Sequence, residues 1–538
     1  MKNRITHFLS VVVAHLFLRR VVRADRIWIP QSLGNPYEGQ YTGIDWYDLN
    51  DDGYPDLLVS AGKHWVDQSY VLINLGSTRF SDPLPLGPPG AYYSVTVGQF
   101  SFGTGVLLSG ADCTISLENQ FGSCTPGTST PALLLQVQVS GCSVSQPNAQ
   151  LCQLDWNVRW QDPSHQGDRN GALAYNLGNG VTVDPALVLV GAGGVKIFEP
   201  PYSSEAPTFT ITPADKLRYQ EDAINRGTGL AVGDIGTDYT GFFVGTRTTN
   251  SAPPAPIVGV WKTGPSQYDW YNLGNANNEY LGNRAIAVQA TGLVLEDLNG
   301  DGIPDLVEAN HVSGLQRVEG FPVQQDYYIL NKDGFGRPAT FSWEATGGRS
   351  VDAGNLFSDN TGPDLVLGTS NGEIVWFENL GSDAKGNEFL GFEERHRIMT
   401  VENCEVRSVK IVPNLLRPCT SSVVAAVYCV LEPSRGGVFA YHDTTSSCPT
   451  ESPTHMPTPT QPTSAPIEKS VISVEEPSNG VVSGVNGDPE YRGDGQGSSG
   501  EGIDRVVESS ISSAVKVSIE ADLALLLFAS ATVFCICA

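Results

Sequence analysis

The sequence predicts an all-β protein, a seven-bladed β-propeller, followed by a disordered stalk rich in Pro, Thr, Gly and Ser. Three observations lead to this prediction. A short acidic motif occurs twice, apolar runs of β type recur seven times, and no stretch between them has a helical period. The 58 Gly and 35 Pro among 538 residues suit a fold with many turns.

The seven apolar runs set the repeat. Their spacing of roughly 50–80 residues is the size of one blade of several strands, and a closed ring leaves no long open sheet edge. We expect the propeller over residues 25–445, with RIWIP (26–30) joining the first blade to the last. Two β-sandwiches are the alternative. The runs are DLLVS (56–60), GVLLSG (105–110), ALVLVG (186–191), GFFVGT (241–246), DLVEAN (305–310), DLVLGT (364–369) and SVVAAV (422–427).

Further strands that end in a turn follow several of these runs. They alternate apolar and polar residues and close on Asn and Gly, which is typical of strands joined by tight turns. The longest interval between runs is expected to hold an insertion, residues 111–155, stapled by disulfides. The turn-ending strands are YVLINLG (70–76), YDWYNLG (268–274), YYILNKDG (327–334) and VWFENLG (375–381).

The acidic motif reads DLNDDGYPD from position 48 and DLNGDGIPD from position 297. Oxygen donors at alternate positions, followed by a glycine that permits a sharp turn, let one segment wrap a hard cation. Calcium fits best because it accepts about six to eight oxygens in flexible geometry, whereas magnesium demands a tight octahedron. A metal-free acidic turn is the alternative. The expected Ca²⁺ ligands are Asp48, Asn50, Asp52, the carbonyl of Tyr54 and Asp56, and then Asp297, Asn299, Asp301, the carbonyl of Ile303 and Asp305.

Two degenerate copies of the motif are expected to bind no calcium. The copy at 355–365 begins at Asn355 and has Phe357 where an oxygen ligand belongs. The copy at 233–243 keeps Asp234 but has Phe242 at the ninth position.

These residues resemble the FG-GAP/VCBS repeat family, which builds the seven-bladed propeller of integrin α-subunit heads. The two acidic loops, each running directly into a strand, and the later V-x-W-F-E-N-L-G strand carry the resemblance over about residues 40–445. The first half of each loop also resembles an EF-hand. Val59 and Glu308 stand where an EF-hand has its last glutamate, and Glu308 lies inside a run that should be a strand. The resemblance implies an extracellular propeller with calcium between strands of a blade.

The ends of the chain predict export and a membrane anchor. Residues 1–24 have the basic start and apolar core of a signal peptide. Residues 446–513 read as a disordered stalk, and its RGD tripeptide (Arg492–Asp494) as a chance match. Residues 514–538 resemble a glycolipid (GPI) attachment signal with Ser512 as the attachment site, and a transmembrane tail is the alternative.

Eight cysteines between the two end segments fit an oxidising compartment. Four in each of two clusters allow two disulfides per cluster with three possible pairings. The candidates are Cys113, Cys124, Cys142 and Cys152, and then Cys404, Cys419, Cys429 and Cys448.

Charge and motifs narrow the function. A formal net charge of −26 argues against nucleic acid as a partner. No nucleophile elbow, zinc-protease motif or phosphate loop occurs, so no catalytic residue is predicted. We expect an adhesion or recognition module at the cell surface for a protein or glycan, with residues 111–155 and the aromatic stretch 268–271 as candidate binding regions. A polysaccharide- or lipid-active enzyme and a passive wall component are the alternatives.

Overall fold

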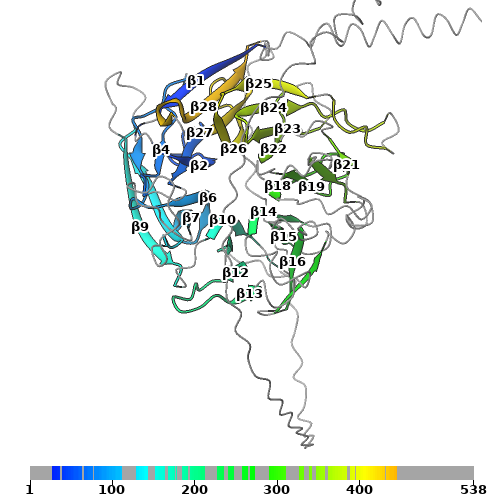
Figure 1. Ribbon diagram of the computed structural model, residues 1–538. Coiled ribbons are helices and arrows are strands. Elements are labelled where there is room, and N and C mark those ends of the chain that lie inside the picture. The colour runs from blue at the N-terminus through cyan, green and yellow to red at the C-terminus, as the bar shows by residue number, and fades with distance from the viewer. Residues whose placement is uncertain are drawn as a thin grey trace, which may run out of the picture. The chain divides into compact units, whose positions relative to one another are not determined.

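The computed structural model describes residues 27–444, apart from short gaps and the longer stretches 112–128, 143–151, 212–226, 247–256, 273–289 and 311–325. This part of the chain forms seven four-stranded antiparallel sheets arranged around a common centre (Figure 1). Its helical structure is a single 3₁₀ turn, η1 (Pro433–Arg435). The predicted seven-bladed propeller is therefore confirmed. The predicted signal peptide, stalk and anchor lie outside the described residues.

Blades 1 to 6 take their strands in chain order from the centre outward, and blade 7 takes its outer strand from the chain ahead of blade 1. Blades 1 to 4 consist of β2 (Tyr41–Tyr47), β3 (Asp56–Ala61), β4 (Tyr70–Leu72) and β5 (Leu84–Pro85); β6 (Tyr92–Phe100), β7 (Gly103–Gly110), β8 (Leu133–Ser140) and β9 (Gln153–Gln161); β10 (Asp168–Ala174), β11 (Ala186–Gly191), β12 (Gly194–Phe198) and β13 (Phe209–Ile211); and β14 (Gly227–Asp234), β15 (Thr240–Thr246), β16 (Val258–Gly264) and β17 (Gln267–Asn272). Blades 5 to 7 consist of β18 (Ala290–Glu296), β19 (Asp305–Asn310), β20 (Tyr327–Ile329) and β21 (Ala339–Thr340); β22 (Gly348–Gly354), β23 (Asp364–Thr369), β24 (Glu373–Phe377) and β25 (His396–Thr400); and β26 (Cys404–Pro413), β27 (Ser421–Cys429), β28 (Gly437–Asp443) and β1 (Trp28–Gly34).

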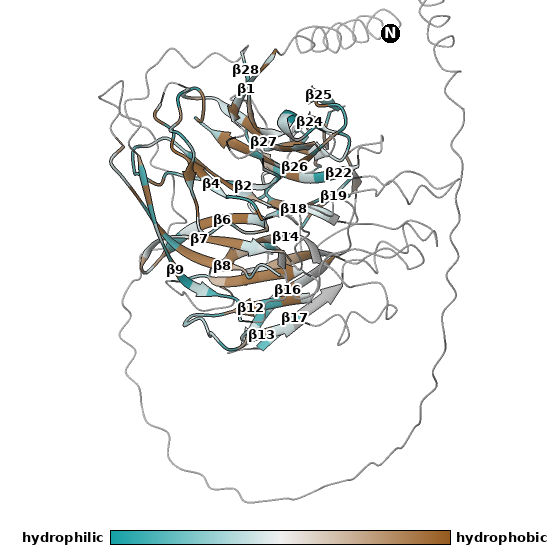
Figure 2. Cartoon of the chain, turned by 60° about the vertical axis from the view of Figure 1, so that its left-hand side comes forward, coloured by the Kyte–Doolittle hydropathy of each residue, from teal (hydrophilic) through white to brown (hydrophobic). Residues whose placement is uncertain are grey.

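The seven apolar runs are the second strands of the seven blades. Strands β3, β11, β19 and β23 are buried at every position. They are continuous rather than alternating because a blade packs on a neighbour at each face. The core is accordingly divided into seven apolar clusters, one at each interface between blades. Figure 2 shows this hydrophobic character along the strands.

The N-terminal strand closes the ring. β1 pairs antiparallel with β28, from Trp28 opposite Asp443 to Gly34 opposite Val438. Strands β2 and β26 are in contact, so the first and last blades meet. The prediction that residues 26–30 join the first blade to the last is confirmed.

A bulge recurs at the start of every inner strand. In all seven blades the register between the first two strands shifts there. In blades 1 and 5 a glycine follows because the next inner strand approaches closely: a Cβ on Gly43 would lie 2.9 Å from the Cα of Ser94, and one on Gly292 would lie 2.9 Å from the Cα of Ser350. The bulge is therefore shared by all seven blades, including those that lack the acidic motif.

Two expectations need correction. Residues 111–155 are not one insertion, because β8 and the start of β9 lie within them as ordinary blade strands with alternating apolar residues. The stretch YDWYNLG is the outer strand β17, whereas the other three turn-ending strands are third strands. Tyr268 stacks on Phe209 of blade 3 with ring centroids 4.7 Å apart, so this residue packs between blades.

Candidate calcium loops

The two acidic motifs occupy the same place in their blades. Each connects an inner strand to a second strand, β2 to β3 in blade 1 and β18 to β19 in blade 5. The blades are four apart in the ring. One local design is therefore repeated.

The first loop is a turn held by its own side chains. Oδ1 of Asp48 accepts the N–H of Asp52 (3.0 Å) and Oδ2 accepts that of Gly53 (2.8 Å). Nδ2 of Asn50 donates to Oδ2 of Asp52 (3.0 Å), and Oδ1 of Asp52 accepts the N–H of Tyr54 (2.9 Å). The predicted side chains at positions 48, 50 and 52 are thus brought together.

The second loop repeats these bonds. Oδ1 of Asp297 accepts the N–H of Asp301 (3.1 Å) and Oδ2 accepts that of Gly302 (2.8 Å). Nδ2 of Asn299 donates to Oδ2 of Asp301 (3.0 Å), and Oδ1 of Asp301 accepts the N–H of Ile303 (2.9 Å).

Two residues of each loop adopt the left-handed conformation. The predicted hinges Gly53 and Gly302 have φ of 86° and 83°. The residue two places earlier does the same: Gly300 at 78°, but Asp51 at 56°. Because a side chain disfavours this region, the first loop carries backbone strain that the second avoids with glycine.

A buried aspartate begins the second strand in three blades, including blade 6, whose acidic loop is degenerate. Asp56, Asp305 and Asp364 are fully buried. In each case one carboxylate oxygen accepts an amide from the preceding loop, and the other accepts an amide from the end of the third strand. The donors are Leu49 (2.9 Å) and Asn74 (2.7 Å) to Asp56, Leu298 (3.0 Å) and Asn331 (2.7 Å) to Asp305, and Leu356 (3.3 Å) and Asn379 (3.0 Å) to Asp364.

The asparagines of this arrangement also join neighbouring blades. Nδ2 of Asn74 donates to the carbonyl of Leu415 in blade 7 (2.9 Å). Nδ2 of Asn379 donates to the carbonyl of Leu298 in the acidic loop of blade 5 (2.8 Å). Sequence reasoning treated these asparagines only as turn residues. The signal for the role of Asn74 and Asn379 was Asn-Leu-Gly in two blades that also have Pro-Asp-Leu; the third such blade has Asn331 in Asn-Lys-Asp-Gly.

Burial and repulsion from neighbouring carboxylates disfavour the ionised forms of Asp56 and Asp305. Burial raises the pKa of Asp56 to about 8, with Asp52 and Asp48 adding repulsion against the opposing effect of its two amide bonds. Burial likewise raises the pKa of Asp305 to about 6. Burial also raises the pKa of Asp48. A divalent cation would reverse this balance by favouring the charged carboxylates.

The donor chemistry of the loops fits calcium, since every candidate ligand is a hard oxygen. Their arrangement here is a hydrogen-bonded turn rather than a coordination shell. Among the described residues, no group of three or more His, Cys, Asp or Glu side chains is placed to hold a metal ion. The carboxylates of Asp56 and Asp305 each accept two amides, and each oxygen keeps a second lone pair. The ligand assignment therefore stays a prediction.

Each of the two degenerate loops places a phenylalanine in the core. Phe357 is 4% exposed and packs between blades 6 and 7, and Phe242 is fully buried between blades 3 and 4. Neither offers an oxygen. Asp234 ends β14, and the residues that follow it to 239 lie outside the described part.

Comparisons with known proteins find similar solved structures and nothing else. No family model matches the chain, and no curated protein matches it. It is similar to two solved structures of BBS1N in complex with ARL6DN, one soaked with mercury and one with lead, at 9% sequence identity in both. The TM-scores are 0.41 and 0.42, with 78% and 79% of this chain and 98% and 99% of those chains covered. At these TM-scores the likeness carries no argument, and the FG-GAP resemblance rests on the loop residues.

Two disulfides are described, one from each predicted cluster. Cys142 pairs with Cys152 in blade 2, and Cys404 pairs with Cys429 in blade 7. Cys419 is exposed, and its N–H donates to Oδ1 of Asn414 (2.7 Å). The other candidates, Cys113, Cys124 and Cys448, lie outside the described residues. Among the described residues, no helix is long and apolar enough to cross a membrane.

Glu308 lies in β19, where the sequence placed it, rather than in the acidic loop. It is buried, with 2% of its surface exposed. Burial raises its pKa to about 7, Asp326 adds repulsion, and a hydrogen bond with Asn310 opposes both. A buried carboxyl in a strand has the environment of a neutral acid, not of an EF-hand ligand.

Replacement of Glu308 by Gln is expected to stabilise the protein at pH 8 and to change little at pH 4.5. A carboxyl whose pKa rises on folding from 4.5 to about 7 keeps its proton in the folded state after the unfolded chain has lost it. Its contribution is therefore fully present below pH 4.5 and is lost as the pH rises to about 7, by about 3 kcal/mol. Urea unfolding at both pH values measures the difference, with exposed Glu205→Gln as the control. An equal effect of E308Q at both pH values would contradict it.

Proposed function

We propose that this protein is a calcium-stabilised extracellular β-propeller that acts at the cell surface as an adhesion or recognition module for a protein or glycan. The observation that carries the proposal is the pair of acidic loops. They have the same sequence pattern, the same position between first and second strands, and the same internal hydrogen bonds. A turn needs no such duplication of Asp, Asn and Asp at alternate positions.

The residues that would hold calcium are those predicted from the sequence. They are Asp48, Asn50, Asp52, the carbonyl of Tyr54 and Asp56 in the first loop, and Asp297, Asn299, Asp301, the carbonyl of Ile303 and Asp305 in the second. When bound, the ion supplies positive charge that offsets three neighbouring carboxylates in each loop. The chain itself provides the support for the loop. Gly53 and Gly302 turn the backbone, and the buried aspartate that follows fixes the loop to the third strand.

Support for an extracellular location comes from the disulfides, which persist in oxidising compartments. The predicted export signal and C-terminal anchor agree with it. A ring of rigid blades that presents loops at its two faces suits recognition, because binding residues are commonly on loops that a rigid scaffold positions. We therefore propose binding rather than catalysis.

The ligand class is tested with arrays of extracellular proteins and of glycans, probed with the purified full chain in millimolar calcium and in a chelator. Saturable binding to one class that weakens in the chelator supports the proposal. Release of products from polysaccharides or lipids in parallel assays would overturn it in favour of an enzyme. Inert results in every assay would also overturn it and favour a structural component.

Chelation is expected to lower the melting temperature. Metal that binds only the folded state stabilises it by RT ln(1 + [L]/Kd), which is about 1–3 kcal/mol per site at extracellular calcium levels. The substitution Asp301→Asn keeps an oxygen for the N–H of Ile303 but removes one charge from the second loop. About half of the calcium dependence should disappear in D301N. Calorimetry with and without chelator measures it, and melting that chelation leaves unchanged would exclude calcium.

A further inference from the structure

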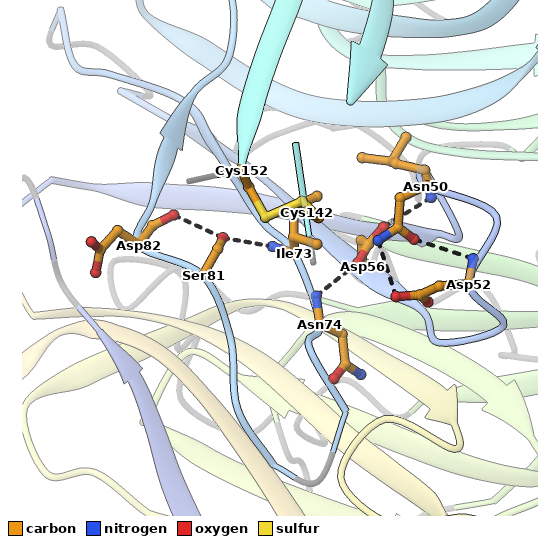
Figure 3. The surroundings of a disulfide bond; sticks show 10 residues. Asn50, Asp52, Asp56, Ile73, Asn74, Ser81, Asp82, Cys142 and Cys152 are labelled. Atoms are coloured by element: carbon orange, nitrogen blue, oxygen red, sulfur yellow. Dashed lines mark hydrogen bonds between the residues drawn. A yellow bond between two sulfur atoms is a disulfide. The ribbon is translucent and has the colours of Figure 1, made fainter. Parts of the chain in front are cut away.

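The disulfide of blade 2 lies beside the first acidic loop. It links Cys142, just after β8, to Cys152, just before β9. Both cysteines belong to the apolar cluster between blades 1 and 2, together with Leu49 and Ile73. Figure 3 shows the disulfide next to Ile73, with Asp56 and Asn50 close by.

Residues of this cluster lie at both bonds that fix the loop to its blade. The N–H of Leu49, which stands between two candidate ligands, donates to Oδ2 of Asp56 (2.9 Å). Asn74, which follows Ile73 directly, donates its N–H to Oδ1 of the same carboxylate (2.7 Å). Leu49 and Ile73 therefore connect the packing around the disulfide to the two backbone amides that bind Asp56.

The second loop is held from its neighbouring blade in a different way. Leu298, the counterpart of Leu49, is fully buried against the aromatic cluster of blades 5 and 6. Its carbonyl accepts Nδ2 of Asn379 (2.8 Å), and the carbonyl of Asn299 accepts Oγ of Ser382 (2.9 Å). The described disulfides lie in blades 2 and 7, outside the cluster that covers this loop.

We propose that the Cys142–Cys152 crosslink sets the cation affinity of the first acidic loop and leaves that of the second unchanged. The proposal rests on the calcium-binding function proposed above. Without the crosslink, the cover over Leu49 and Ile73 loosens and the loop backbone samples more conformations. Cation binding must then order the loop, and the cost of this ordering lowers affinity. The strain at Asp51, absent from the second loop, makes the first loop the more dependent on its cover.

Calcium titration of the full chain tests the proposal. Isothermal calorimetry is carried out on Cys142→Ser/Cys152→Ser, with Asp52→Asn and Asp301→Asn used to assign each site. The expected result is about a tenfold or greater rise in Kd at the first site, which is about 1.4 kcal/mol, with the second site unchanged. The matched control is Cys404→Ser/Cys429→Ser, which removes a disulfide between paired strands of blade 7 and should alter neither site.

Hydrogen exchange in the absence of calcium gives a second readout. Without the Cys142–Cys152 crosslink, the amides of Leu49 and Asn74 should exchange faster, while those of Leu298 and Asn331 should not. Leu49→Ala, which leaves both the disulfide and the ligands in place, should give the same selective effect if the double variant does not fold.

The outcomes separate the two proposals. A wild-type chain that binds no calcium overturns both the calcium function and the coupling. Calcium binding that is unchanged at the first site in both cover variants overturns only the coupling. An equal loss at the two sites also overturns it, because general destabilisation would then explain the effect.

Discussion

Replacement of Asp364 by Ala is expected to lower the free energy of unfolding by about 3–5 kcal/mol, although the loop of its blade is not predicted to bind calcium. Its carboxylate accepts the N–H groups of Leu356 and Asn379, and the aspartate is fully buried. Alanine would leave both amides without an acceptor, and each buried unsatisfied group costs about 1–3 kcal/mol. The loss would also release Asn379, which holds the neighbouring blade.

Urea unfolding in calcium and in chelator measures this effect. The penalty in D364A should be the same in both buffers, because Phe357 replaces an oxygen ligand in this loop. The exposed strand residue Asp155 provides the control, and its replacement by Ala should stay within about 0.5 kcal/mol of wild type.

Asp305→Ala makes a useful comparison. It removes the same kind of support and, in addition, a predicted calcium ligand, so its penalty should be larger in calcium than in chelator. A D364A penalty below about 1 kcal/mol would contradict the structural role of these aspartates. A penalty that grows in calcium would instead indicate a metal site in blade 6.

The fold could be predicted from the sequence because the second strand of every blade is an apolar run, and these runs mark the repeat. A strand buried on both faces must be apolar throughout, so DLVLGT (364–369) is recognisable even where the acidic loop has decayed. The closing strand was also predictable, since an apolar segment ahead of the first blade has no other partner. Residues 111–155 were wrongly predicted to be one insertion because the segment is long and contains four cysteines. Strand β8 and the start of β9, with their alternating apolar and polar residues, lie within it.

The supports of the site were not predictable because they depend on proximity between distant segments. Asp364 and Asn379 look like turn residues until the second and third strands lie side by side. Prediction of the disulfide pairing likewise requires the register between strands, because Cys404 and Cys429 are directly opposite each other in β26 and β27. Three pairings were equally open from the spacing alone.

Replacement of Lys196 by Met is expected to lower the free energy of unfolding by about 3–5 kcal/mol, because it removes the cation that pairs with the buried carboxylate of Asp162. Nζ of Lys196 in β12 lies 2.6 Å from Oδ2 of Asp162, and the two side chains are 3% and 0% exposed. Asp162 follows β9, so the pair joins blade 3 to blade 2. This ion pair could not be predicted from the sequence, because neither residue belongs to the repeated motifs.

The loss of stability in K196M should come from the buried charge of Asp162 that no longer has its cation, rather than from the lost attraction between Lys196 and Asp162. The double variant Lys196→Met/Asp162→Asn should therefore recover most of the stability, since desolvation of two charges offsets much of what their attraction contributes. Arg435→Gln, which breaks an exposed pair with Glu432 whose side chains are 45% and 61% exposed, should change stability by about 1 kcal/mol or less. Urea unfolding of the three variants decides the point: if the double variant is as unstable as K196M alone, the pair contributes real attraction, and blade 2 depends on it for its position beside blade 3.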